Sequence, residues 1–266
     1  MERRIVTEGF VGDLLACARD LGVDPAPYLA EAGLPADPRG PITDAAFGRL
    51  WWGIAQAAGD EFLGLGARPM RPGAFALMCQ AMLHAGTLER ALRRGLRFLA
   101  VVLDAPAGSL QLRGGEVEIT LSAAPGPRPA FAYRTFWLIL MGAACWLVGR
   151  RIPLRALDVA GAAPAGRRDF LTFFGAPVRF DRAQTRLVFD AAYLKLPTIR
   201  SEAALRGYLR AAPGNLLVRY RAEAGMAARV RAYLAARPPA DWPGFEALAA
   251  ALELSPAPLR RQLRAD

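Results

Sequence analysis

The final stretch of the chain carries three arginines at a spacing that suits contact with a polyanion. Leu259 and Leu263 lie four residues apart and form one apolar stripe of an expected helix. With that stripe turned inward, Arg260, Arg261 and Arg264 point outward. Arginine can pair with both acceptors of a guanine edge or can hold a phosphate, so the pattern predicts a nucleic-acid contact. Two-helix hairpins with surface arginines are also common in helical proteins, and that interpretation stays open at this point.

A second amphipathic helix is expected just before this one. Its apolar residues recur at i, i+3, i+4 and i+7 and form a single stripe: Phe245, Leu248, Ala249 and Leu252. Ser255 is a good N-cap for the following helix, and Pro256 suits its first position. The small Ala249 allows two helices to cross closely. The spacing therefore predicts a helix-turn-helix over 244–265, with the second helix shaped to enter a major groove.

Few residues could support enzymatic chemistry. His84 is the only histidine, so a catalytic triad or a histidine-based metal site has at most one member of that type. Cys17, Cys79 and Cys145 are scattered without a CxxC spacing, which argues against a zinc site and a disulfide framework. No glycine pair has the spacing of a phosphate-binding loop. The sequence therefore predicts a protein that is not an enzyme, with no catalytic residues, no metal and no cofactor.

The charge of the chain favours a negatively charged partner. Its 266 residues carry a formal charge of +10 and are 53% apolar, which is enough for a substantial core. Residues 200–266 hold eleven arginines against six acidic residues, a net +5, and the much longer stretch before them carries the same net charge. Positive charge is thus concentrated towards the C-terminus.

One apolar stretch has to be weighed against a membrane span. Residues 136–149 read FWLILMGAACWLVG, which is 14 residues and short of the roughly 20 that a bilayer requires. Arginines flank the stretch on both sides, and we expect a buried core helix. The N-terminal residues lack a signal-peptide pattern, and the scattered cysteines fit a reducing compartment. We therefore expect no membrane partner and a cytoplasmic protein.

Hydrophobic periodicity predicts a mixed α and β region followed by helices only. Helices are expected over 8–20, from Thr43 to Gly59, from Pro72, from Thr87, and over 129–149, 167–175, 199–211 and 214–236. Alternation predicts a β-hairpin over 109–122, a strand over 154–161 and a second hairpin within 176–190. The order predicts an α+β unit to about residue 195 and an all-α region after it.

The closing segment resembles the first helix-turn-helix of AraC/XylS-type transcription regulators. The matching residues are Glu246 and Ala249 in the first helix and Ser255, Leu259, Arg261 and Leu263 in the S-x-x-x-L-x-R-x-L pattern of the second. Upstream, RPGAFALMCQAMLHAGTLERALRRGLRF and FLTFFGAPVRFDRAQTRLVFDAAYLKLP resemble the effector-binding and dimerisation domain of the subgroup related to ornithine-utilisation regulators. The resemblance extends over nearly the whole chain.

The resemblance implies a domain organisation and a set of partners. It implies an α+β effector-binding and dimerisation domain over 1–196, a linker helix region over 197–222 and an all-α DNA-binding domain over 223–266. The family's DNA-binding domain has two helix-turn-helix units, so the chain is expected to end inside the first one and to bind specific DNA weakly by itself. The implied partners are double-stranded promoter DNA, a small-molecule effector and a second copy of the chain, with RNA polymerase left open.

Residue roles follow from the same resemblance. Ala257, Arg260, Arg261 and Arg264 correspond to outward positions of the recognition helix. Among them, Arg260 and Arg261 are expected to read bases, and Arg264 is expected to contact phosphate.

Large apolar side chains of the N-terminal region are candidates for the effector pocket, because such groups dominate ligand cavities. The candidates are Trp51, Trp52, Phe75, Met78, Tyr133, Phe136 and Trp137. We expect Trp52, Tyr133 and Trp137 to bind the ligand. An alternative function is a stand-alone small-molecule sensor that acts through protein contacts, and an enzyme would need an ordered catalytic triad in the pocket.

Overall fold

The chain folds into two compact units, Met1–Tyr220 and Arg221–Asp266. The computed structural model describes residues 4–122, 128–164, 170, 174–216, 226, 230, 233, 234, 241–252 and 254–265, with the backbone alone at 4, 5, 262, 264 and 265. The helix expected over 167–175 and the one expected over 214–236 lie largely outside these residues.

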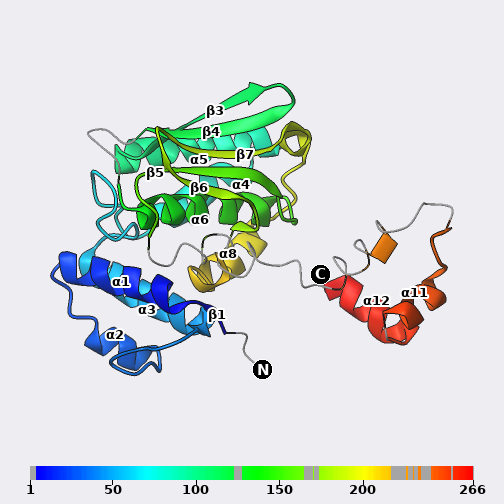
Figure 1. Cartoon of the computed structure of the whole chain (residues 1–266), viewed down its shortest axis with the longest axis horizontal. Coiled ribbons are helices and arrows are strands. Elements are labelled where there is room, and N and C mark those ends of the chain that lie inside the picture. The colour runs from blue at the N-terminus through cyan, green and yellow to red at the C-terminus, as the bar shows by residue number, and fades with distance from the viewer. Residues whose placement is uncertain are drawn as a thin grey trace. The chain divides into compact units, whose positions relative to one another are not determined.

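The helices of the first unit begin and end close to the residues that the sequence predicts (Figure 1). Among the described residues these are α1 Glu8–Asp20, α3 Asp44–Ala58, α4 Ala74–Leu83, α5 Leu88–Leu103, α6 Ala130–Leu147 and α8 Glu202–Arg210. A further short helix, α2 Ala26–Glu31, is not predicted by the sequence pattern. Helix α3 shows why the local signals work. The Thr43 hydroxyl caps it by accepting a hydrogen bond from the Ala46 amide at 3.1 Å, and Gly59 ends it with φ of 65°.

Helix α6 forms the centre of the core. All of its residues from Phe131 to Leu147 are buried. By length and composition it is also the one helix among the described residues that could cross a bilayer, but 94% of it is buried inside the protein. The expectation of a buried core helix is therefore confirmed.

A five-stranded sheet packs on the helices. Its strands are β3 Ala107–Arg113, β4 Glu116–Ser122, β5 Leu154–Ala160, β6 Val178–Arg182 and β7 Thr185–Asp190, and their order across the sheet is β3-β4-β7-β5-β6. Helices α5 and α6 contact β3 and β5 and cover one face (Figure 1). A separate short pair, β1 Arg4–Val6 with β2 Ile42–Thr43, lies beside α3.

The two predicted hairpins have different outcomes. Strands β3 and β4 pair antiparallel around Gly114-Gly115, as predicted. Strands β6 and β7 exist, but the prediction that they pair with each other is wrong, because β5 lies between them, parallel to β6 and antiparallel to β7. The physical reason lies at Asp158 on β5, whose carboxylate accepts hydrogen bonds from Arg179 of β6 at 2.7 Å and from Arg186 of β7 at 3.0 Å.

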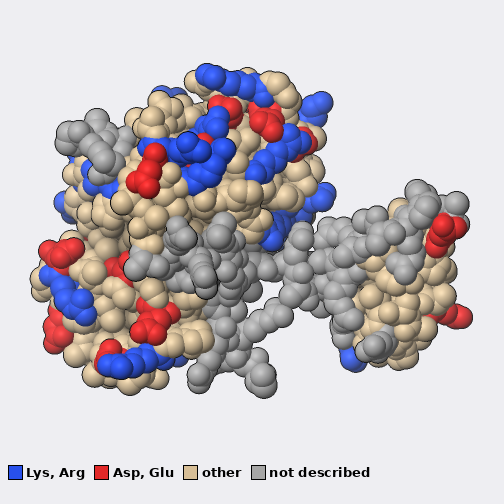
Figure 2. Space-filling model, in the orientation of Figure 1, with Lys and Arg blue, Asp and Glu red and all other residues tan. Residues whose placement is uncertain are grey.

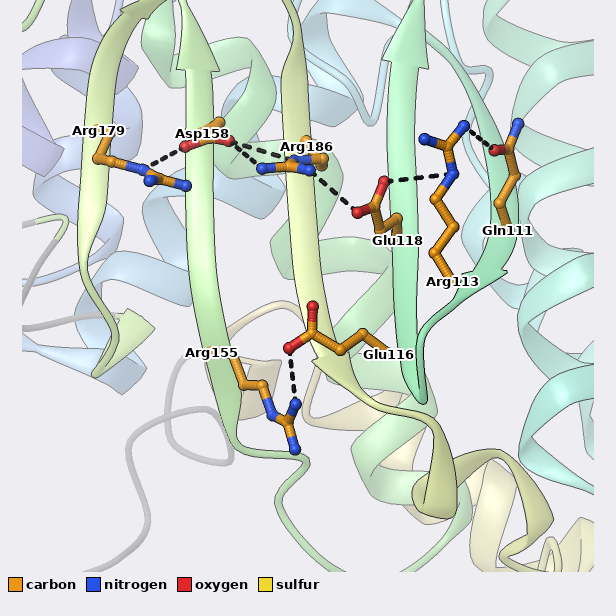
Figure 3. Close-up of polar contacts among 8 residues, drawn as sticks. All are labelled: Gln111, Arg113, Glu116, Glu118, Arg155, Asp158, Arg179 and Arg186. Carbon is orange, nitrogen blue, oxygen red and sulfur yellow. Dashed lines mark hydrogen bonds and ion pairs between the residues drawn. The ribbon is translucent and has the colours of Figure 1, made fainter.

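Side chains of alternating charge extend this contact across the whole sheet, on the face opposite to α5 and α6 (Figure 3). We call Arg179, Asp158, Arg186, Glu118 and Arg113 the charge row. Arg186 donates to Glu118 at 3.0 Å, and Arg113 lies 4.0 Å from the other oxygen of the same carboxylate. Each of the five strands contributes one member.

A second, shorter group lies beside the charge row. Arg155 of β5 donates to Glu116 and to Asp190, each at 2.6 Å. Basic and acidic side chains are accordingly intermixed over the strands (Figure 2).

Candidate functional site

The C-terminal unit contains the two helices that the closing segment predicts. They are α11 Phe245–Ala251 and α12 Pro256–Ala265. The residues buried between them come from both helices and from the chain before them: Met226, Leu248, Ala249, Leu252 and Leu259. Ala249 and Leu259 are each 0% exposed, which is the close crossing that the small side chain at 249 allows.

The outward face of α12 presents the expected residues. Ala257, Arg260 and Arg261 are exposed. The Arg260 guanidinium lies 5.2 Å from the centre of the Phe245 ring, so this aromatic side chain helps to position it. Arg264 lies on α12, but its side chain is outside the described part of the chain. Such a face can bring guanidinium groups to phosphates or to guanine edges.

One apolar position of α11 is not where the sequence pattern puts it. Phe245 is 37% exposed and is not part of the buried stripe. Phe245 is the first residue of α11, and its ring lies beside the exposed arginines of α12. The guanidinium of Arg260 covers part of this ring. The buried stripe therefore consists of Leu248, Ala249 and Leu252.

The first unit holds a cavity of about 160 Å³, which we call the aromatic cavity. Its lining residues come from α3 and α4 and the loop between them, from α6, and from a 209–216 segment that begins in α8. They are Trp51, Trp52, Ala55, Glu61, Gly73, Phe75, Ala76, Ile139, Leu209, Ala212, Pro213 and Leu216. Glu61 is the one charged residue among the lining residues that the structure describes, and the others are apolar or aromatic.

Hydrogen bonds fix Glu61 at the start of α4. One carboxylate oxygen accepts from the Gly73 amide at 2.8 Å and the other from the Phe75 amide at 2.7 Å. Burial raises the pKa of this carboxyl group, and the two amide hydrogen bonds oppose that rise. The neighbouring Asp60 shapes the same loop, because its carboxylate accepts from three backbone amides between residues 62 and 70.

The structure places one of the three expected ligand-binding residues on this cavity. Trp52 lines it, but Tyr133 and Trp137 do not. Tyr133 is 1% exposed, and its hydroxyl accepts from the Arg128 amide at 2.9 Å. Trp137 is fully buried and packs edge-on against Phe136. Both lie on a face of α6 other than that of Ile139, the α6 residue on the cavity wall.

The sequence pattern also missed part of the cavity wall. Glu61 and the 209–216 segment carry no local periodicity that marks them as lining residues, because the cavity exists only where distant stretches meet. One sequence signal could have pointed to Glu61. It is the pair of acidic residues, Asp60 and Glu61, directly after Gly59, which ends α3.

Within the part of the chain that the structure describes, groups with catalytic potential are gathered neither at the C-terminal helices nor at the aromatic cavity. His84 is exposed, and its Nε2 lies 3.3 Å from Glu202. Burial raises the pKa of the Cys17 thiol to about 12, which disfavours a thiolate there. Within the described ranges there is no cluster of three metal-ligating side chains.

Comparison with known proteins identifies the family. Residues 22–198 match the model of the arabinose-binding domain of AraC transcription regulators. The chain belongs to this family. It is similar to the ornithine utilization regulator of Pseudomonas aeruginosa, with 28% identity over 230 residues, which cover 85% of this chain and 67% of that protein.

One solved transcriptional regulator also gives a match. The crystal structure of the transcriptional regulator CdpR from Pseudomonas aeruginosa is 19% identical and gives a TM-score of 0.37, covering 91% of this chain and 77% of that one.

Proposed function

We propose that this chain is a DNA-binding transcription regulator of the AraC type whose DNA binding responds to a small molecule held in the Met1–Tyr220 unit. Membership of the family supports the transcriptional role. The observation that carries the DNA-binding part is the two-sided character of α12, where Leu259 is fully buried and Arg260 and Arg261 are exposed. A helix anchored on one face and cationic on the other suits the major groove.

The arginines of α12 have different proposed roles. Arg260 and Arg261 read base edges, and a bidentate pair with guanine discriminates by about 1–3 kcal/mol. Arg264 contacts phosphate, which contributes affinity without sequence preference. Ala257 lies at the outward edge of the first turn, where a small side chain leaves room for a base.

A binding assay with the DNA upstream of the gene tests this proposal. Protein expressed from the natural gene should shift that DNA, and Arg261→Ala should weaken the specific complex by about 5-fold to 150-fold. Arg97→Ala removes an exposed arginine from α5 in the other unit and serves as the charge-matched control. Equal losses from both variants, or no specific complex, would contradict the proposal.

The effector is proposed to bind in the aromatic cavity and to act through its wall. Leu209, Ala212, Pro213 and Leu216 line the cavity, and the first unit ends only a few residues later at Tyr220. A ligand therefore touches the stretch of chain that leads into the C-terminal unit. Coupling between two sites of this kind is commonly about 1–3 kcal/mol.

Further partners follow from family resemblance alone. We propose that the protein acts as a homodimer, because paired half-sites on DNA mirror a two-fold symmetric protein. Contact with RNA polymerase would accompany activation of transcription.

The alternative function is a small-molecule sensor that acts by binding a partner protein. Exposed aromatic side chains in the C-terminal unit favour it, since Trp242 is 51% exposed and Phe245 is 37% exposed. Aromatic residues are enriched at protein interfaces. A ligand response without any DNA complex would support this alternative.

A further inference from the structure

The aromatic walls of the cavity offer π faces to a ligand. Trp51 already uses its indole N–H, which donates to the Glu61 carbonyl oxygen at 3.4 Å, so its ring is what remains for contact. Trp52 is 51% exposed, and Phe75 contributes a third ring to the lining. Tryptophan is the side chain with the strongest cation–π attraction. These walls suit a cation with a hydrocarbon body.

Glu61 gives the cavity a single negative charge. Each of its oxygens accepts one backbone amide hydrogen bond and, with two lone pairs, keeps capacity for a second. A nearby cation stabilises a partly buried carboxylate, because the cation compensates for the hydration that the carboxylate has lost. A ligand ammonium group can meet this requirement beside the start of α4.

The rest of the cavity wall is unsuited to a ligand carboxylate. No basic side chain is present among the residues that the structure places on the wall, so a ligand carboxylate would lie near Glu61 without a partner. The volume also sets the size of the group that the cavity can enclose. A dry apolar cavity of about 150 Å³ holds benzene, and this one measures about 160 Å³.

We propose that the aromatic cavity binds a small organic amine, a monocation with a hydrocarbon body about the size of one aromatic ring and with no carboxylate. This ligand class rests on the proposed function, in which it is the effector. The ammonium group pairs with Glu61, and the hydrocarbon body lies against Trp51, Trp52 and Phe75. Amino acids are disfavoured, because none of the lining residues that the structure describes carries a positive charge to pair with their carboxylate.

Calorimetric titration of the purified protein with four compounds of one ring size tests the inference. Benzylamine should bind most tightly, and benzyl alcohol about 10-fold to 100-fold more weakly, since its hydroxyl group can still donate one hydrogen bond to Glu61 but carries no positive charge. Phenylacetate and phenylalanine should bind more weakly than benzylamine. Equal affinity for the amine and the alcohol, tighter binding of a carboxylate, or no binding of benzylamine would overturn the inference.

Two tryptophan variants locate the binding site. Trp52→Ala should lower the affinity for benzylamine, whereas Trp242→Ala should not, although both side chains are 51% exposed. Ala76→Leu, which fills the cavity from α4, should also lower the affinity. Glu61→Gln can disturb folding because it loses one of the two acceptors for the α4 amides, so the compound series decides the role of the charge. Unchanged affinity in both Trp52→Ala and Ala76→Leu would place binding elsewhere and overturn the inference.

The same measurements separate this inference from the proposed function. Benzylamine binding without any change in DNA affinity supports the ligand class and contradicts the effector role. Specific DNA binding together with no benzylamine binding contradicts the ligand class alone.

Discussion

Replacing Gly48 by alanine tests whether the 209–216 segment is held against α3. A Cβ added at Gly48 would lie 2.7 Å from both the Cα and the N of Gly214, closer than real Cβ atoms approach backbone. Overpacking of this kind costs about 1–3 kcal/mol. Gly12, also the fifth residue of its helix, has nothing within 4 Å of an added Cβ. Alanine in a helix interior otherwise stabilises by roughly 0.5–1 kcal/mol, and both variants share this gain.

The difference between the two variants therefore isolates the close approach. Urea unfolding followed by tryptophan fluorescence measures the free energy of unfolding of each variant. Gly12→Ala should raise this free energy above that of the unmodified protein. The value for Gly48→Ala should lie about 1–3 kcal/mol below that of Gly12→Ala. Four of the five tryptophans lie in the first unit, so the signal reports mainly on that unit. Gly48→Ala should also weaken the effect of the ligand on DNA binding. Equal shifts from both variants would refute the packing of the segment on α3 and, with it, the proposed coupling.

Three further predictions concern charge and capping. Asp158→Ala should destabilise the first unit by about 2 kcal/mol in urea unfolding, because the Asp158 side chain is 10% exposed and its carboxylate pairs with arginines on two strands. Asp37→Ala is the control and should leave the unfolding midpoint unchanged, because Asp37 belongs to an ion pair whose side chains are 82% and 74% exposed. Burial raises the pKa of Glu61, so its carboxylate becomes protonated at a higher pH than that of an ordinary glutamate. Calorimetry should therefore show the affinity for benzylamine falling as the pH drops through the pKa of Glu61. Over the same pH range the protein should gain stability, because protonation removes the unfavourable buried charge. Thr43→Ala removes the cap on the Ala46 amide and should lower stability by about 1 kcal/mol in the same unfolding assay.

Local signals in the sequence predict most of the helices. The Thr43 cap, the Gly59 end and the apolar repeat between them all act within a few residues, and α3 follows them. The pairing of β6 and β7 could not be predicted in the same way. Alternation locates a strand, but its neighbour is fixed by contacts between distant stretches, such as those of Asp158 with Arg179 and Arg186, more than twenty residues away.

The same distinction applies to the candidate site. The exposed positions of α12 follow from a short helical repeat, so Arg260 and Arg261 lie where the sequence predicts. The cavity depends on long-range packing. Tyr133 and Trp137 have the right chemistry for a ligand site, but they lie on a buried face of α6, whereas Glu61 reaches the wall through the loop that leads into α4.

The sheet surface with its interleaved ion pairs has a consequence for long-range attraction. The charge row and the group around Arg155 together contain four arginines and four carboxylates, which cancel. An approaching polyanion would therefore experience almost no net field from this broad, arginine-rich area. If the protein binds DNA as proposed, the positive charge that attracts the duplex therefore comes from surfaces other than this sheet, despite its many guanidinium groups.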